Sequence, residues 1–158
     1  MLVLLFYLGD IMYAISCEKI REIVPVTTLK TVPGAPEFFA GFFNYRGEIV
    51  PVLDLCRLIR DQGCVMRLST RIILADYHGQ DGRSHILGLM AERVTETIKK
   101  EPGSLISPSV QLKEALYLDK IIMEKGSMIQ HINLDLLPDC IAFLPDADNG
   151  GKNALRRY

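Results

Sequence analysis

The residues best suited to chemistry lie in segment 41–55, where two apolar runs meet at a polar tip. The tip offers an amide, a guanidinium and a glycine, from Asn44, Arg46 and Gly47. Asn and Gly tolerate the positive φ of tight turns, so the segment predicts a β-hairpin that presents Arg46. A catalytic loop usually combines a nucleophile, a general base and an oxyanion donor, and this tip has none of that set. Its chemistry suits contact with another protein.

Metal chemistry is the first alternative, because Cys56, Cys64, His78 and His85 occur close together in the sequence. Structural zinc sites usually pair their ligands about two to four residues apart, and no Cys-x-x-Cys or His-x-x-x-His spacing occurs. We therefore expect no metal ion and no cofactor. With no secretion signal, we expect the thiols to stay free in the reducing cytosol.

Hydrolytic chemistry is the second alternative, although no Gly-x-Ser-x-Gly segment places a serine on a strained turn. Phosphate-binding glycine loops are also missing from the sequence. The sequence therefore predicts a protein that is not an enzyme. The side chains that could supply a triad are Ser16, Ser69, His85, His131, Asp54 and Asp76.

The charge of the chain argues against nucleic acid and membrane surfaces as partners. The net charge of the 158 residues is −1 and the pI is about 6.3, which leaves no cationic field for a polyphosphate. Aromatic residues between 38 and 45 could stack on single-stranded bases, but no run of Lys or Arg accompanies them. Segment 1–8 is apolar yet far shorter than a membrane span, so we interpret it as a first strand in a cytoplasmic protein.

Short apolar runs bounded by turn residues predict an all-β fold. Short helices are expected at 18–24, 53–59 and 112–118, and Pro51 places its strand at a sheet edge or a bulge. Segment 145–158 has little to bury and is expected to be a disordered tail. The predicted strands are 3–8, 12–15, 49–53, 72–75, 85–90, 121–123 and 128–132.

Three ordered segments resemble the CheW family of chemotaxis coupling proteins. The first is 6–15 followed by 20–23, which is similar to the family's opening hairpin and the element after it. The second is 33–41 with 44–55, which contains Asn-Tyr-Arg-Gly-Glu-Ile-Val-Pro-Val-Leu-Asp-Leu. The third, 88–96, is similar to the family's glycine, apolar, acidic and valine pattern.

The resemblance implies two small five-stranded SH3-like β-barrels, together forming one domain over residues 1–144. It also implies an adaptor that couples methyl-accepting chemoreceptors to the regulatory domain of a CheA-type histidine kinase. Such a protein would be cytoplasmic, would reach the membrane only through receptors, and would self-associate in signalling arrays. Its output would be chemotaxis or a related pathway controlling surface sensing, pili or cyclic dinucleotides.

Position by position, the resemblance marks partner-binding residues. Arg46 could pair with a receptor carboxylate in a forked geometry, and Glu22 offers the opposite charge. For the glycine and aliphatic positions a role in core packing is equally open. The full set is Ile20, Glu22, Gly41, Asn44, Arg46, Gly47, Leu89 and Val94.

The chain also departs from the family pattern. Tyr45 stands where the family usually has Leu, and Glu92 stands where it usually has Asp. These differences suit a coupling protein of a dedicated pathway. The alternative function is a small-molecule-binding β-barrel protein that uses the groove between the barrels.

Overall fold

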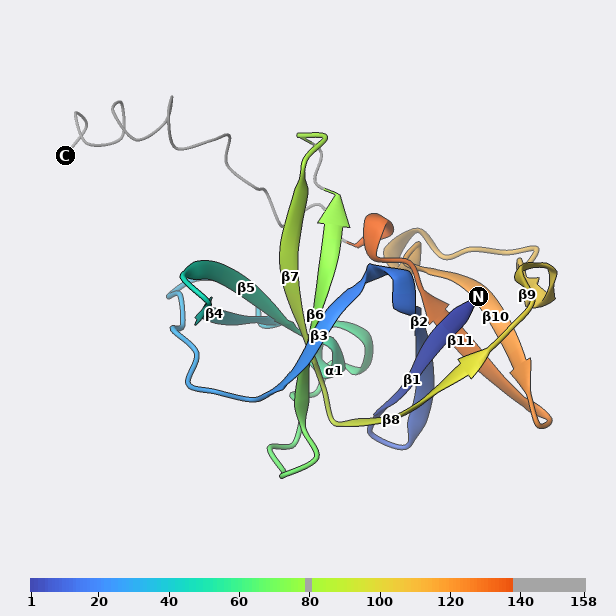
Figure 1. The fold of residues 1–158 in the computed structure, drawn as a ribbon, viewed down its shortest axis with the longest axis horizontal. Coiled ribbons are helices and arrows are strands. Elements are labelled where there is room, and N and C mark those ends of the chain that lie inside the picture. Colours follow the sequence, from blue (N-terminus) through green and yellow to red (C-terminus); the bar gives the residue numbers. More distant parts are fainter. Residues whose placement is uncertain (79–80, 138–158) are drawn as a thin grey trace.

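The computed structural model describes residues 1–78 and 81–137, and nearly all of its regular structure is β-strand (Figure 1). One α-helix, α1 (Leu55–Arg60), follows β5 directly, and four short 3₁₀ helices lie in the connections. The strands are β1 (Leu2–Leu8), β2 (Ile11–Ser16), β3 (Ile20–Pro25), β4 (Phe39–Tyr45), β5 (Glu48–Asp54), β6 (Arg71–His78), β7 (Ser84–Ala91), β8 (Arg93–Lys99), β9 (Leu105–Ile106), β10 (Leu118–Glu124) and β11 (Ser127–Ile132). The 3₁₀ helices are η1 (Cys17–Lys19), η2 (Pro102–Ser104), η3 (Lys113–Ala115) and η4 (Leu134–Leu136).

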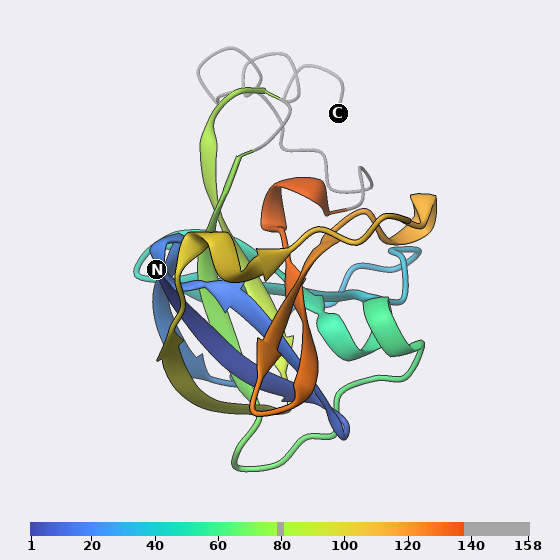
Figure 2. The same ribbon diagram turned by 90° about the vertical axis from the view of Figure 1, so that its right-hand side faces the viewer.

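The strands form two sheets, which confirms the predicted all-β class. The five-stranded sheet has the order β3-β6-β7-β5-β4. The other has six strands in the order β8-β1-β2-β11-β10-β9, because the two-residue β9 adds to an otherwise five-stranded arrangement. Figure 2 looks onto this six-stranded sheet, which lies on the right in Figure 1.

The five-stranded sheet curls until its two edge strands approach each other. In a flat sheet β3 and β4 would lie about 19 Å apart, four strand spacings. Instead, Lys30, in the segment after β3, exchanges backbone hydrogen bonds of 2.7 and 2.9 Å with Phe42 of β4. This curl brings residues near 22 and residues near 46 together.

The six-stranded sheet must curl because the segment between its two edge strands is short. Its edge strands β8 and β9 are consecutive in the sequence, and residues 100–104 join them. Those residues span at most about 20 Å, whereas five flat strand spacings would need about 24 Å. Both sheets therefore have the wrapped shape that the resemblance implied.

In the inner strands, successive side chains point alternately to the two faces of the sheet and so enter two different hydrophobic clusters. In β6, Ile73 and Ala75 enter a central cluster between the sheets, whereas Ile72 and Leu74 enter a cluster inside the five-stranded sheet. β1 is divided in the same way between the central cluster and a third cluster inside the six-stranded sheet. The shared central cluster joins the two sheets into one packed unit.

Two local predictions were wrong. Segment 18–24 was expected to be helical, but only η1 is helical and 20–25 form β3, whose inward residues alternate. Pro51 was expected to place its strand at a sheet edge or at a bulge in that strand, whereas β5 has neighbours on both sides. Its ladder with β7 begins only at Val52, and the bulge lies in β4 between Phe39 and Gly41.

Other predictions are confirmed, are confirmed only in part, or lie outside the described residues. α1 matches the helix expected at 53–59, whereas the helix expected at 112–118 is reduced to η3. The tail expected at 145–158 lies outside the described residues. Within the described residues, no helix combines the length and the apolar character needed to cross a membrane.

Candidate functional site

The predicted hairpin is formed by β4 and β5, with Arg46 and Gly47 at its two-residue tip. Their φ angles are 52° and 86°, the positive values that a type I′ turn requires at both central positions. The Asn44 side chain completes the turn, because its Oδ1 accepts a hydrogen bond of 2.7 Å from the Gly47 N–H. Asn44 and Gly47 therefore shape the backbone that presents Arg46.

Glu22 of β3 faces this tip from the opposite edge of the curled sheet. The Tyr45 hydroxyl donates a hydrogen bond to Glu22 Oε2, and Arg46 Nη2 lies 3.4 Å from the same oxygen. The Arg46 guanidinium also lies over the Tyr45 ring, 5.1 Å from its centroid. The Arg46 side chain remains 75% exposed, so it is oriented by two neighbours and still accessible to a partner.

The electrostatics of the tip follow from the shared carboxylate. The hydrogen bond to Glu22 raises the pKa of Tyr45, and partial burial acts in the same direction. The nearby Arg46 and Arg21 guanidinium groups oppose that rise. Tyr45 therefore stays a neutral hydrogen-bond donor at physiological pH.

Gly41 lies earlier in β4, away from the tip, and has a structural role in the described fold. Its φ is 137°, and an added Cβ would lie 2.6 Å from the carbonyl oxygen of Lys30. That carbonyl belongs to the Lys30–Phe42 pair that joins the two edges of the sheet. Gly41 thus permits the closure that brings Glu22 to Arg46.

The three aliphatic positions do not join the tip. Leu89 has 0% exposed surface and belongs to the central cluster. Ile20 and Val94 are half-buried and pack against the same cluster, Val94 from a strand of the other sheet. At Leu89 the groove expected between the barrels is filled by the protein's own core.

Two features of the site were missed in the sequence. Tyr45 was noted only as a departure from the family pattern, yet it binds Glu22 directly. Arg21, next to Glu22, pairs with Asp76 of β6 at 2.5 Å. The segment 20–24 reads Ile-Arg-Glu-Ile-Val, so its two charges are adjacent and the sequence contains no clear alternation that would have predicted a strand carrying both.

The structure also tests the triad candidates. Ser16 Oγ lies 3.1 Å from His131 Nε2, and His131 Nδ1 lies 2.9 Å from Asp119 Oδ1. Asn133 Nδ2 donates to the other Asp119 oxygen at 3.0 Å. The acid is therefore neither Asp54 nor Asp76. This chain of bonds satisfies the buried polar groups of Ser16 and His131 where β2 and β11 run side by side.

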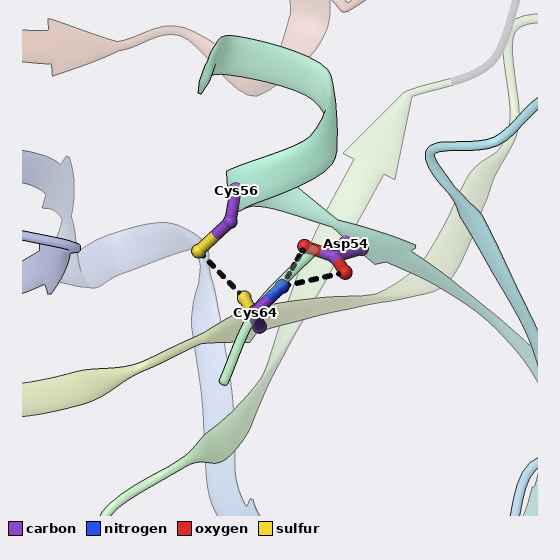
Figure 3. A group of neighbouring side chains, drawn as sticks. All are labelled: Asp54, Cys56 and Cys64. Carbon is purple, nitrogen blue, oxygen red and sulfur yellow. Dashed lines mark hydrogen bonds between the residues drawn. The ribbon is translucent and has the colours of Figure 1, made fainter. Parts of the chain in front are cut away.

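One group of described residues has the donor types of a metal site. The ligand atoms of Asp54, Cys56 and Cys64 all lie within 4.8 Å of one another (Figure 3). Sequence spacing did not predict this proximity, because eight positions separate the cysteines. Asp54 accepts hydrogen bonds from the backbone of both Arg57 and Cys64, and so it holds α1 against the following loop.

Comparison with known proteins places the chain in a family. The CheW-like domain matches residues 2–139. The chemotaxis protein CheW of Klebsiella aerogenes is 34% identical over 98 residues, 58% of each chain. Protein FrzA of Myxococcus xanthus is 30% identical over 89 residues, 56% of this chain and 52% of that protein.

A solved structure gives the same result. The scaffolding protein TtCheW of Thermoanaerobacter tengcongensis aligns with a TM-score of 0.75 and 28% identity, and the alignment covers 86% of each chain. These two curated relatives are matched over 58% and 52% of their own lengths. The domain match, in contrast, spans nearly the whole chain, and this protein therefore belongs to the family of CheW-like domains.

Proposed function

We propose that this chain is a non-catalytic adaptor that couples methyl-accepting chemoreceptors to a CheA-type histidine kinase. Family membership supports the proposal, as do the curated names of its relatives, several of which are chemotaxis proteins. The similar solved structure is described as a scaffolding protein. Its working place would be the cytoplasm, with the membrane reached only through receptors.

The observation that carries the proposal is the Arg46 tip. A guanidinium presents five N–H donors in a planar fork, and the interactions of Arg46 within the described residues use only one of its nitrogens. The side chain is held by Tyr45 and Glu22, so less conformational entropy is lost when a partner binds. An acidic side chain on a partner helix would fit this arrangement.

The shared core supports one domain over residues 1–144 as the unit that carries both interfaces. One candidate binding surface is the tip of the five-stranded sheet, and a second partner or another copy of the chain would need a different face. With a net charge of −1, the chain has no field that would favour nucleic acid instead.

A binding experiment with a matched control tests the proposal. Lys125 is the control, since Lys125 and Gly126 form the β10–β11 turn with φ angles of 47° and 81°, close to those of Arg46 and Gly47. Wild type, Arg46→Glu and Lys125→Glu would be titrated with a receptor signalling tip and with the kinase regulatory domain from the same organism. We expect Arg46→Glu to lose about tenfold or more in affinity for one partner, and Lys125→Glu to bind like wild type.

The possible outcomes test the adaptor function and the role of Arg46 separately. Binding of neither partner by wild type would overturn the adaptor proposal and favour the small-molecule alternative. Equal binding by wild type and Arg46→Glu would retain the adaptor but reject the Arg46 assignment. Circular dichroism melting curves show whether each variant is folded, and an exposed turn charge is expected to change stability by less than about 1 kcal/mol.

A further inference from the structure

The sulfur atoms of Cys56 and Cys64 face each other at 2.7 Å (Figure 3). Cys56 lies in the first turn of α1, and Cys64 lies in the loop that follows the helix. The Asp54 carboxylate fixes both positions, because it accepts hydrogen bonds from Arg57 N at 3.1 Å and from Cys64 N at 3.0 Å. The approach of the two thiols is therefore built into the backbone.

The geometry fits a disulfide better than a metal ion. Two thiolates around a tetrahedral zinc ion, each about 2.3 Å from the metal, lie about 3.8 Å apart. A disulfide needs about 2.05 Å, so the observed 2.7 Å is nearer to the covalent bond. Both oxygens of Asp54, the third candidate ligand, already accept the Cys64 backbone N–H, at 3.3 and 3.0 Å.

The protons of the two thiols are arranged in a relay. Cys64 donates to the Cys56 sulfur, and Cys56 donates to Glu92 Oε1 at 3.4 Å. Burial raises the pKa of Glu92, but hydrogen bonds from Val65, Cys56 and Gly9 lower it to a net value below the usual range. The hydrogen bond to Cys56 and burial, followed by the neighbouring Asp54, raise the pKa of Cys64. Cys64 thus holds its proton, while Glu92 is an ionised acceptor beside Cys56.

Access to the pair is provided from two sides. Cys56 has only 1% exposed surface, but it lines a cavity of about 230 Å³ together with Arg60 and Glu92. A molecule the size of hydrogen peroxide fits easily in such a volume, since a liquid water occupies about 30 Å³. Cys64 is itself partly exposed.

We propose that Cys56 and Cys64 form a reversible disulfide when a peroxide oxidises the protein. The Cys56 sulfur attacks one peroxide oxygen as its proton passes to Glu92, the O–O bond breaks, and Cys56 becomes a sulfenic acid. The leaving hydroxide takes up that proton and departs as water. Cys64 then attacks the Cys56 sulfur, the S–O bond breaks as the S–S bond forms, and the leaving hydroxide takes up the Cys64 proton and departs as a second water. Two electrons pass from the two thiols to the peroxide.

The bond would tie α1 to the loop that follows it. Reduction by a dithiol restores the free thiols found in this structure. Cytosolic disulfides of this transient kind typically sense oxidants. The assignment is independent of the adaptor function, because none of its residues belongs to the Arg46 tip.

The test uses the reduced full-length protein and hydrogen peroxide. After treatment, the intact mass is recorded, and free thiols are then blocked with N-ethylmaleimide for a non-reducing peptide map. We expect a loss of about 2 Da, a cross-link between the peptides containing Cys56 and Cys64, and reversal by dithiothreitol. Cys17→Ala should behave like wild type, because Cys17 lies on η1 and takes no part in the Cys56–Cys64 contact, whereas Cys56→Ala and Cys64→Ala should not lose the 2 Da.

Several results would contradict the proposed Cys56–Cys64 disulfide. Addition of oxygen atoms without the loss of about 2 Da, or a cross-link to Cys17 or Cys140, would reject the pair. So would one zinc per chain in the purified protein, lost in both Cys56→Ala and Cys64→Ala. The wild-type peptide map decides the matter if either variant fails to fold. Glu92→Gln, which cannot take up the proton, should slow disulfide formation about tenfold or more, and an unchanged rate would reject Glu92 as the base.

Discussion

The two sheets each carry a hairpin with the same kind of tip, but among the described residues only the Arg46 tip has side-chain partners. Arg46–Gly47 and Lys125–Gly126 both place a basic residue and a glycine at positive φ. Arg46 is held by the Tyr45 ring and by Glu22. Within residues 1–78 and 81–137, Lys125 has no ion pair or hydrogen bond of its side chain.

The difference lies in what faces each tip. The five-stranded sheet curls so that β3 reaches the end of β4, and β3 delivers a carboxylate to the basic side chain. At the other tip, the neighbouring Glu124 pairs instead with Lys100. A turn sequence alone therefore specifies the backbone, and the closure of the sheet supplies the neighbours that orient the basic side chain.

Breaking that closure should have the largest effect. In Gly41→Ala, the new Cβ would meet the Lys30 carbonyl at a φ of 137°, and we expect a loss of about 2–4 kcal/mol in the free energy of unfolding. Gly126→Ala is the control, since nothing lies within 4 Å of its added Cβ and only the positive φ costs about 1 kcal/mol. Urea denaturation measures both values, and equal losses would contradict the closing role of Gly41.

A lysine at position 46 would keep the positive charge of the tip and change only the shape of the cation. Arg46→Lys keeps the positive charge but removes the planar fork, so we expect about a tenfold loss of affinity for the partner that contacts the tip. The reverse change, Lys125→Arg, should leave affinity unchanged. Isothermal titration calorimetry distinguishes these results, and full affinity in Arg46→Lys would show that charge alone suffices.

The turn itself should depend on Asn44. Removing the side chain in Asn44→Ala leaves the Gly47 N–H without its 2.7 Å acceptor, and we expect a loss of about 0.5–1 kcal/mol in stability. Met123 occupies the equivalent position of the other hairpin, and Met123→Ala should cost less because that side chain is exposed. A larger loss in Met123→Ala, measured by thermal unfolding, would contradict this assignment.

The smallest expected effect is in the titration of Tyr45. Its pKa in the folded protein lies above the ordinary 10.0, so its contribution to stability is complete below pH 10.0 and is lost as the pH rises through the folded value. Glu22→Gln should move the Tyr45 titration to lower pH. Ultraviolet titration, with Tyr45→Phe subtracted to isolate this group, checks the shift, and an unchanged curve would exclude Glu22 as its cause.

Local turn chemistry explains why part of the site could be predicted from the sequence. The polar tip and its glycine predicted the hairpin correctly, and the roles of Asn44 and Gly47 follow from the same argument. Strand β3 was missed because Ile20, Ile23 and Val24 also fit a helical spacing. Its inward Glu22 interrupts the apolar alternation, and Tyr45 and Arg46 satisfy that charge only after the sheet closes.

Long-range contacts account for the remaining differences. Strand β8 was overlooked because polar residues separate Val94 from Ile98, and these two residues pack on different clusters on either side of a register shift with β1. The proximity of Cys56 and Cys64 depends on a single carboxylate that caps α1 and also binds the Cys64 backbone. The spacing of Cys56 and Cys64 along the chain does not predict that arrangement.

The meeting of the two sheet edges also limits how the Arg46 surface can be copied. A peptide with residues 39–54 contains the turn but lacks Glu22, which comes from a strand at the far edge of the sheet. In such a peptide the guanidinium would lose its carboxylate neighbour, and an isolated two-stranded hairpin is only marginally stable in water. Mimics of this surface will therefore have to reproduce the folded barrel, and any substitution that keeps the sheet from closing will take Glu22 away from Arg46 even where the hairpin sequence is unchanged.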